Sequence, residues 1–410
     1  MPLGSQPTLV VDGRQLAFPR TGLAVLTEDL VHALAESADD RRILLLLDGS
    51  RPLEGRSFAT GETVTVMRLR RRPRRLGAWL FLGRLLAVPD HFERMAWAHF
   101  ASHAIAALPA PGRLFVPYFF NYGRLRSNVV LVPDLIHQDP GLAAPLVRAR
   151  FGLGWRHRLP IRRLLQAREE SAVVQAHRIV AYSRFVADQV QSKLHVAPDR
   201  IVRITVGLPR WVSELLDHQT TQSLRRRYEL PDRFAVYVGG FAARKNVAFL
   251  LEVIDQLHAL EPSFRCAMVG LADEAPRLER LPPFSTLLER PHVRQAVIPL
   301  PSLPRAELSS LYHLSSFVAY PSLEEGLGLP VLEAAAAGKV CLCGDNSALR
   351  EVQAEPFYRV DSLDRPAWIQ RLRHVWSHAD ALPPADVVRE SFQRFRWQPA
   401  AETLWQALLP

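Results

Sequence analysis

Short runs of apolar and β-branched residues alternate with helix-like segments along the chain, and this alternation constrains the fold more than any other feature of the sequence. Strands that alternate with helices are typical of a parallel sheet covered by helices on both faces. In the first half we expect strands over Thr8–Val11, Arg42–Leu47, Thr63–Val66, Leu114–Val116, Asn128–Val132, Arg178–Ala181 and Ile201–Ile204. In the second half we expect them over Phe234–Val238, Arg265–Val269, Val293–Ile298, Phe317–Tyr320 and Val340–Cys343.

The length of 410 residues exceeds what one ordinary hydrophobic core organises and predicts two domains. Each set of strands is enough for one Rossmann-like domain, and the break at Gly207-Leu208-Pro209 separates residues 1–207 from residues 208–390. The predicted fold class is therefore α/β, with two Rossmann-like domains facing across a cleft. Because such sheets bind ligands beyond the carboxyl ends of their strands, we expect the site in that cleft.

Composition excludes several classes of protein. Hydrophobic residues at 48% and charged residues at 22% indicate a globular chain. The longest apolar stretch, 76–88, is interrupted by Arg84 and is too short to span a membrane. Residues 1–6 have no signal-peptide pattern, so we expect a cytoplasmic protein. The cysteines Cys266, Cys341 and Cys343 lie in predicted buried strands, which favours neither a metal site nor a redox role.

The formal charge of +10 is concentrated in two basic segments. Arginines crowd Arg68–Arg75 directly before Trp79, Leu80 and Phe81, and residues 148–168 interleave arginines with apolar side chains. Basic residues beside apolar ones are typical of attachment to an anionic membrane, here the inner face of the plasma membrane. A solvated basic face is the alternative. Nucleic acid is not an expected partner, because no nucleic-acid-binding motif accompanies the charge.

Two glutamates eight positions apart, Glu325 and Glu333, enclose a segment with two glycines and a proline. Pro330 predicts the start of a helix over 330–337 with Gly338 as its cap. The helix N-terminus and the N–H groups around Gly326, Leu327, Gly328 and Leu329 make a site for a phosphate. The alternative is that Glu325 is a solvated loop residue and Glu333 a helix-start glutamate that complements the macrodipole.

A second segment places cations at the start of another predicted helix. Gly239 and Gly240 follow a predicted strand, and Arg244, Lys245 and Asn246 precede an amphipathic helix over 247–260. Asn246 is predicted to cap that helix. Arginine binds a diphosphate bidentately and lysine binds it as a point charge, so this segment is the predicted site for a leaving diphosphate.

These two segments resemble retaining glycosyltransferases of family four, which have the GT-B fold and the E-x7-E motif. Residues 321–334, PSLEEGLGLPVLEA, are similar to the family's PS-x-x-EGFGLP-x-x-EA, and residues 239–246 to its G-x-x-x-x-R-K-N. The resemblance implies that Glu325 hydrogen-bonds the donor sugar and that Glu333 holds the nucleotide ribose. It further implies that Arg244 and Lys245 stabilise the leaving diphosphate without a metal or cofactor. The segment 391–410 resembles the family's closing helix, which returns to the first domain.

The first domain resembles the family less closely. Residues 20–27, with Arg20 and Gly22, are similar to the family's first loop, but Ala24-Val25-Leu26 replaces part of its usual sequence. Asp134 matches the family's V-H-D-L segment, although Pro133 stands where that segment has histidine. His137 is a candidate to replace that histidine, and we assign Arg20, Gly22, Asp134 and His137 to the acceptor side.

The sequence therefore predicts a glycosyltransferase that moves a hexose, with mannose or rhamnose favoured, from a nucleotide diphosphate sugar to a glycan or lipid-linked acceptor. The opening residues resemble bacterial mannosyl- and rhamnosyltransferases of surface polysaccharide and lipopolysaccharide assembly. The alternative is a non-catalytic protein that binds nucleotide sugars as a partner in a glycan-assembly complex. The altered loops at Gly22 and Pro133 motivate that alternative.

Overall fold

The structure is a computed structural model, and it describes residues 9–17, 22–49, 63–69, 97, 101–108, 113–117, 128–135, 167, 170–171 and 173–408. The chain divides into two compact units. The first holds the described residues up to Gly207 and those from Arg396, and the second holds 208–395. Residues 391–395 thus group with the second unit, whereas the sequence predicts that they belong to the returning helix.

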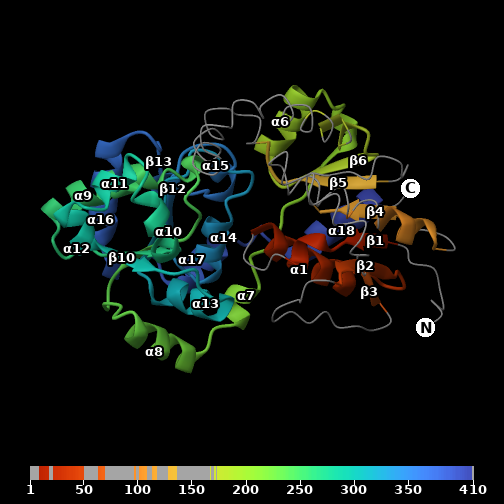
Figure 1. Ribbon diagram of the computed structural model, residues 1–410. Coiled ribbons are helices and arrows are strands. Elements are labelled where there is room, and N and C mark those ends of the chain that lie inside the picture. Colours follow the sequence, from red (N-terminus) through yellow and green to blue (C-terminus); the bar gives the residue numbers. More distant parts are fainter. Residues whose placement is uncertain are drawn as a thin grey trace. The chain divides into compact units, whose positions relative to one another are not determined.

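The first unit is built on a parallel sheet that has seven strands among the described residues, in the order β3-β2-β1-β4-β5-β6-β7 (Figure 1). Its strands are β1 (Leu9–Asp12), β2 (Ile43–Asp48), β3 (Val64–Leu69), β4 (Arg113–Val116), β5 (Asn128–Val132), β6 (Arg178–Ala181) and β7 (Ile201–Arg203). Its other elements are η1 (Arg14–Ala17), α1 (Gly22–Glu36), α6 (Arg184–Leu194), η4 (Pro198–Arg200) and α18 (Trp397–Leu408).

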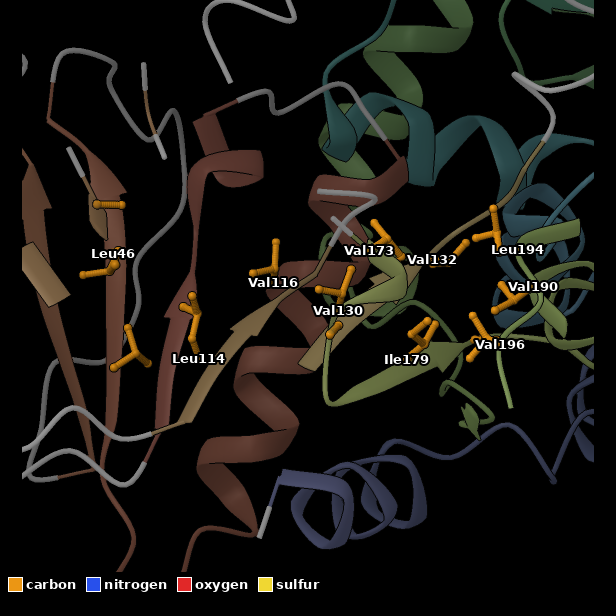
Figure 2. Packing of buried hydrophobic residues seen from close by; sticks show 14 of the residues in the cluster. Leu46, Leu114, Val116, Val130, Val132, Val173, Ile179, Val190, Leu194 and Val196 are labelled. Carbon is orange, nitrogen blue, oxygen red and sulfur yellow. The ribbon is translucent and has the colours of Figure 1, made fainter. Parts of the chain in front are cut away.

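One face of this sheet packs into a cluster of buried aliphatic side chains, which Figure 2 shows from close by. Strands β2, β4, β5 and β6 contribute Leu46, Leu114, Val130 and Ile179, and α6 adds Val190. Strand β2 is buried along its whole length, as expected for a strand with helices on both faces. Burial of these side chains provides the main stabilisation of the unit.

The returning helix α18 packs against α1 within the first unit. Trp397 lies against Gly207, where any side chain would collide with the indole ring. The indole N–H of Trp405 donates to the carbonyl of Leu34 at 3.2 Å. The C-terminal segment therefore completes the hydrophobic packing of the unit that begins the chain.

The second unit contains a parallel sheet of six strands in the order β10-β9-β8-β11-β12-β13. Strands β10, β12 and β13 are labelled in Figure 1. The strands are β8 (Ala235–Tyr237), β9 (Cys266–Val269), β10 (Val297–Leu300), β11 (Phe317–Tyr320), β12 (Cys341–Gly344) and β13 (Arg359–Val360). The helices are α7 (Trp211–Glu214), α8 (His218–Arg227), η5 (Ala243–Lys245), α9 (Val247–Leu260), α10 (Leu271–Leu278), α11 (Phe284–Leu287), α12 (Pro291–Ala296), α13 (Arg305–Leu314), α14 (Leu329–Ala336), α15 (Leu349–Val352), η6 (Pro356–Tyr358), α16 (Arg365–Ser377), η7 (Ala379–Ala381) and α17 (Ala385–Ser391).

Both sheets share one topology, that of doubly wound nucleotide-binding folds. In each, the chain builds outward on one side of its first strand and then crosses to the other side. The reversal falls between β1 and β4 in the first unit and between β8 and β11 in the second. Ligands bind such sheets at the carboxyl ends of the two strands that flank the reversal. In the second unit these ends are followed by the loops after β8 and β11, where a ligand site is therefore expected.

Two elements of the second sheet differ from the sequence-based prediction. The strand predicted over 293–298 is wrong for its first half, because Pro291 begins α12 and the strand starts only at Val297. Pro299 fits within β10 because that strand lies at the sheet edge. Strand β13 was missed, since two residues are too few to produce a periodic pattern. None of the helices in the described ranges is long and apolar enough to cross a bilayer.

Candidate active site at the reversal of the second sheet

The loop after β8 leaves open space above its backbone at one glycine. A side-chain carbon added to Gly240 would meet no atom within 4 Å, whereas one added to Gly239 would lie 2.8 Å from the hydroxyl of Tyr237. That hydroxyl donates to the carbonyl of Gly240 at 2.7 Å and fixes the loop. The two predicted donor-loop glycines therefore serve different purposes: Gly239 fits a crowded backbone, and Gly240 leaves room for a ligand.

Hydrogen bonds join the loops after β8 and β11 directly. The carbonyl of Arg244 accepts from the N–H of Leu323 at 2.7 Å and from the hydroxyl of Ser322 at 2.9 Å. The guanidinium of Arg244 donates to the carbonyl of Glu324 at 3.3 Å. These contacts bring together two segments that lie about 80 positions apart in the sequence.

The carboxylate of Glu325 is the centre of this arrangement. Its Oε1 accepts hydrogen bonds from Lys245 at 2.6 Å, from the Tyr320 hydroxyl at 2.7 Å and from the Ser322 hydroxyl at 2.6 Å. Its Oε2 forms an ion pair with Arg244 at 2.8 Å. Two cations around one carboxylate leave an excess of positive charge, which suits an anionic ligand.

Burial alone would raise the pKa of Glu325, but the charges of Lys245 and Arg244, with hydrogen bonds from Lys245 and Ser322, lower that pKa to about 2. Glu325 is therefore an acceptor of hydrogen bonds at neutral pH and has no proton to donate. The alternative of a solvated loop glutamate is wrong, since Glu325 is only 7% exposed.

The structure modifies the predicted roles of the residues beside Glu325. Arg244 and Lys245 lie at the start of α9 as predicted, and each contacts Glu325. Asn246 occupies the N-cap position of α9 as predicted, but its side chain makes no capping hydrogen bond and instead donates to the carbonyl of Ser362 at 2.8 Å. Asn246 occupies the left-handed region at φ 55°, a conformation that asparagine tolerates better than most residues.

Helix α14 begins one residue earlier than predicted, at Leu329, and ends at Ala336. Gly328 precedes it at φ +89°, and a side chain there would also meet Leu349 at 2.6 Å. No side chain caps this N-terminus. Pro330 has no N–H and Val331 donates to the carbonyl of Gly328 at 3.0 Å, so the N–H of Leu329 is the one left to a ligand in the first three positions of the helix. At the other end, Gly338 and Lys339 donate to Ala335 and Ala334, which closes the helix as glycine motifs do.

Glu333 lies beyond the first turn of α14 and is buried, so the alternative of a macrodipole glutamate is wrong. The hydroxyl of Tyr312 donates to its Oε2 at 2.6 Å. Burial raises the pKa of Glu333, while the Tyr312 hydrogen bond and the charges of Arg305 and Lys245 oppose that shift. The two glutamates of the motif therefore occupy opposite electrostatic environments.

A layer of small polar side chains behind Glu325 was missed from the sequence. The hydroxyl of Ser347 accepts from the N–H of Glu325 at 2.9 Å, and Asn346 donates to the carbonyl of Ser322 at 2.8 Å. Ser362 donates to the same carbonyl at 2.9 Å. The feature that marks this layer is the left-handed backbone of Ser347 at φ 43°, which the sequence does not reveal. This layer holds the loop after β11 in one conformation.

The first unit carries fewer of the predicted site residues. Gly22 is the first residue of α1, and Asp134 follows β5 directly. Arg20 and His137 lie outside the described residues, as do Arg70–Arg75 and Trp79–Phe81 of the basic segment. At the end of β1, Asp12 accepts hydrogen bonds from the backbone of Arg14 at 2.9 Å and from the Trp97 indole at 3.0 Å, which gives it a structural role.

Metal-binding clusters of three or more suitable side chains are absent from the part of the chain that the structure describes. The three cysteines are buried in β9 and β12, and burial raises the pKa of the Cys266 thiol to about 12. These thiols stay protonated and unreactive at neutral pH.

The segment that contains this site matches a known protein family. Residues 221–362, which include both loops, match the family described as glycosyl transferases group 1. This segment is a group 1 glycosyltransferase domain.

The similarity to curated proteins extends beyond residues 221–362. The serotype-specific mannosyltransferase WbdA of Escherichia coli is 26% identical over 391 residues, which covers 90% of this chain and 43% of WbdA. The D-inositol 3-phosphate glycosyltransferase of Salinispora tropica is 30% identical over 216 residues, half of this chain and 44% of the relative. The chain thus spans less than half the length of these curated relatives.

Solved structures show that the group 1 glycosyltransferase domain is part of a GT-B fold. Sucrose-phosphate synthase from Thermosynechococcus elongatus aligns over 98% of both chains, with a TM-score of 0.67 and 16% identity. WaaG, a glycosyltransferase involved in lipopolysaccharide biosynthesis, aligns over 98% of this chain and 99% of its own, with a TM-score of 0.64 and 14% identity. Both parallel sheets described above therefore belong to the fold predicted from the sequence.

Proposed function

We propose that this protein is a retaining hexosyltransferase that uses a nucleotide diphosphate sugar. The observation that carries the proposal is the cluster at the reversal of the second sheet, where Arg244 and Lys245 share Glu325. Beside the cluster lie an uncapped helix N-terminus and the open space over Gly240. These are fixed positive groups next to the positive end of a helix dipole, which is the arrangement that a departing diphosphate requires.

The proposed mechanism follows from where charge develops. Cleavage of a sugar–phosphate bond leaves positive charge on the anomeric carbon and negative charge on the diphosphate. Arg244, Lys245 and the N–H of Leu329 at the start of α14 stabilise the diphosphate, while Glu325 accepts hydrogen bonds from hydroxyls of the sugar. The donor phosphate takes the proton of the acceptor on the same face, so the anomeric configuration is retained.

We further propose that the reaction needs no divalent metal, because Arg244 and Lys245 supply the neutralising charge. The second unit would bind the donor through Glu325, Glu333 and the glycines of the two loops. The acceptor would bind near Arg20, Gly22, Asp134 and His137.

Mannose is the favoured sugar, and a surface glycan or lipid-linked glycan is the favoured acceptor. The names of two Escherichia coli relatives support this choice, since both WbdA and the O-antigen chain mannosyltransferase B are described as mannosyltransferases. Other relatives are described as D-inositol 3-phosphate glycosyltransferases, so a different acceptor is the alternative to test. Rhamnose is the second sugar to test.

Thermal stabilisation by a panel of nucleotide sugars tests the proposal, followed by a transfer assay with the best donor. A donor at 100 times its dissociation constant adds about 2.7 kcal/mol to the free energy of unfolding. Activity in excess EDTA is expected to equal activity with added magnesium or manganese. Absence of stabilisation by any nucleotide sugar, or activity that EDTA abolishes and manganese restores, contradicts the proposal.

Attachment to the inner face of the plasma membrane is the last part of the proposal and rests on the sequence of Arg68–Arg75. Each basic residue near an anionic surface contributes about 1 kcal/mol, so binding to vesicles with phosphatidylglycerol should weaken with salt. We expect the triple variant Arg70/Arg71/Arg72→Ser to lose most of that binding. Equal sedimentation of the variant and the natural protein would show that the segment is a solvated face.

A further inference from the structure

The two oxygens of the Glu333 carboxylate are not equivalent. Oε2 accepts the hydrogen bond from Tyr312 at 2.6 Å. Oε1 accepts no hydrogen bond from the described residues, yet it is not fully enclosed, so solvent or a ligand can reach it. One oxygen is therefore used by the protein, and the other remains available as an acceptor.

The tyrosine that makes this difference is held rigidly. Tyr312 is fully buried on α13, with its ring 6.4 Å from that of Trp211. Its carbonyl accepts from the Ser315 hydroxyl at 2.8 Å, and Ser309 one turn earlier donates to the carbonyl of Val212 at 2.5 Å. The helix is thus fixed to α7 on one side, which holds the Tyr312 hydroxyl against Glu333.

We infer that Tyr312 is a positioning residue for nucleotide recognition: it holds Oε2 of Glu333 and so presents Oε1 to a hydroxyl of the nucleotide's ribose. The inference rests on the proposed function, in which Glu333 binds ribose. The hydroxyls of a ribose need acceptors at defined positions. A carboxylate that is free to rotate would have its oxygens at those positions for a smaller fraction of the time.

Electrostatics give this hydrogen bond a second role, which is to keep Glu333 ionised. Burial favours the protonated form of Glu333, and the Tyr312 hydrogen bond is foremost among the opposing effects on its pKa. The charges of Arg305 on α13 and Lys245 on η5 act in the same direction as that bond. From the neighbouring strands, Tyr320 of β11 and Cys341 of β12 act on Tyr312. Loss of the hydroxyl therefore moves the titration of Glu333 to higher pH.

The test is the affinity for GDP and for UDP as a function of pH, measured by calorimetry on the full chain between about pH 5 and about pH 8.5. In Tyr312→Phe, the loss of affinity on acidification should begin at higher pH than in the natural protein. We expect affinity at the acidic end to fall about tenfold for each unit of that displacement. At the alkaline end, where Glu333 is ionised in both proteins, we expect the loss of positioning alone to weaken affinity by about threefold at most. Glu333→Gln should bind weakly at every pH.

Tyr182→Phe is the matched control, because it removes a buried tyrosine hydroxyl of the first unit that makes no hydrogen bond among the described residues. Its pH profile for nucleotide affinity should follow that of the natural protein. A Tyr312→Phe profile that loses affinity at the same pH as the natural protein, or one that Tyr182→Phe reproduces, overturns the inference and leaves Tyr312 a packing residue.

A ligand-free measurement separates this inference from the proposed function. Failure of the natural protein to bind either nucleotide would remove ribose binding but not the link between Tyr312 and Glu333. In that case the free energy of unfolding against pH decides: Tyr312→Phe should be destabilised most where Glu333 is ionised, and the double variant Tyr312→Phe/Glu333→Gln should recover stability. If the double variant is no more stable than Tyr312→Phe, the link is overturned. The same comparison holds if Tyr312→Phe alone fails to fold, because the double variant should then fold.

Discussion

The two glutamates of the 325–333 segment differ in almost every physical respect, although both are 7% exposed. Glu325 lies in a loop and accepts from two cations and two hydroxyls, and its pKa is lowered to about 2. Glu333 lies on a helix with one tyrosine hydroxyl as its donor among the described residues, and burial raises its pKa. Equal burial thus says little about a carboxylate until its partners are known.

The difference teaches what each end of the segment is built to do. At the Glu325 end the protein supplies four donors, three of them to Oε1, so that end contributes to folding and offers the ligand an organised charge cluster with Oε2 as the less occupied acceptor. At the Glu333 end the carboxylate is left short of partners, a state that costs stability and is relieved when hydroxyls of a ligand bind.

Glu325→Gln should have the largest effect on stability, because it removes the shared partner of Arg244 and Lys245 and leaves two adjacent cations. Breaking a buried ion pair from one side costs about 3 to 5 kcal/mol, to be measured by urea denaturation at neutral pH. Glu289→Gln is the matched control, since it breaks an ion pair with Arg294 whose side chains are both 60% exposed. A cost of less than 1 kcal/mol for both variants would contradict the distinction between the two ends.

The pH dependence of that cost follows from the lowered pKa of Glu325. Because the folded pKa of about 2 lies below the ordinary value of 4.5, the stabilisation is fully present above about pH 4.5 and is lost as the pH falls toward 2. The difference in the free energy of unfolding between the natural protein and Glu325→Gln should shrink across this window. A difference that stays constant from neutral to acidic pH would show that Glu325 is not ionised by its partners.

Glu333→Gln should change stability in the opposite direction and by less, about 1 kcal/mol. Burial raises the pKa of Glu333 above 4.5, so the folded protein holds a proton that the unfolded chain releases. The free energy of unfolding therefore falls as the pH rises from 4.5 through the raised pKa of folded Glu333. Glutamine does not titrate, so Glu333→Gln avoids this loss of stability. Denaturation of Glu333→Gln at neutral pH should show equal or greater stability than the natural protein, and clear destabilisation would be the contrary result.

Ser322→Ala should have the smallest effect of the series. It removes one of the donors to Glu325 and the bond to the carbonyl of Arg244, while both ion pairs remain. We expect a cost of about 1 kcal/mol and a slightly higher pH for the acid transition. A cost as large as that of Glu325→Gln would mean that the serine, rather than the cations, organises the loop.

The sequence predicted the strands, α9 and the order of the charged segments because those features are local. Runs of buried apolar residues predict β8 and β11, and the spacing of apolar residues predicts the bounds of α9. Pro330 and Gly338 predict α14 to within one residue at each end. That Arg244, Lys245, Glu325 and Glu333 belong to one site was implied by the family resemblance of their two segments.

The partners within the site could not be predicted, because they depend on which side chains meet in space. Tyr320 and Tyr312 were part of apolar patterns, and nothing in those patterns says which acceptor a buried hydroxyl finds. Ser347 and Ser362 lie on loops where serine is common. The ion pairs of Arg244 and Lys245 with Glu325 likewise could not be predicted, because they depend on the hydrogen bonds that join the two loops.

The division of labour between the two glutamates is tested most directly by calorimetric titration of the free nucleotide diphosphate into Glu325→Ala and Glu333→Ala. Loss of one hydrogen bond to a charged group costs about 1.5 to 3 kcal/mol, so Glu333→Ala should weaken binding more than tenfold. Glu325→Ala should bind the nucleotide as well as the natural protein does, and its defect should lie in turnover. Equal nucleotide affinity in the natural protein and both variants would contradict the assignment of the two carboxylates.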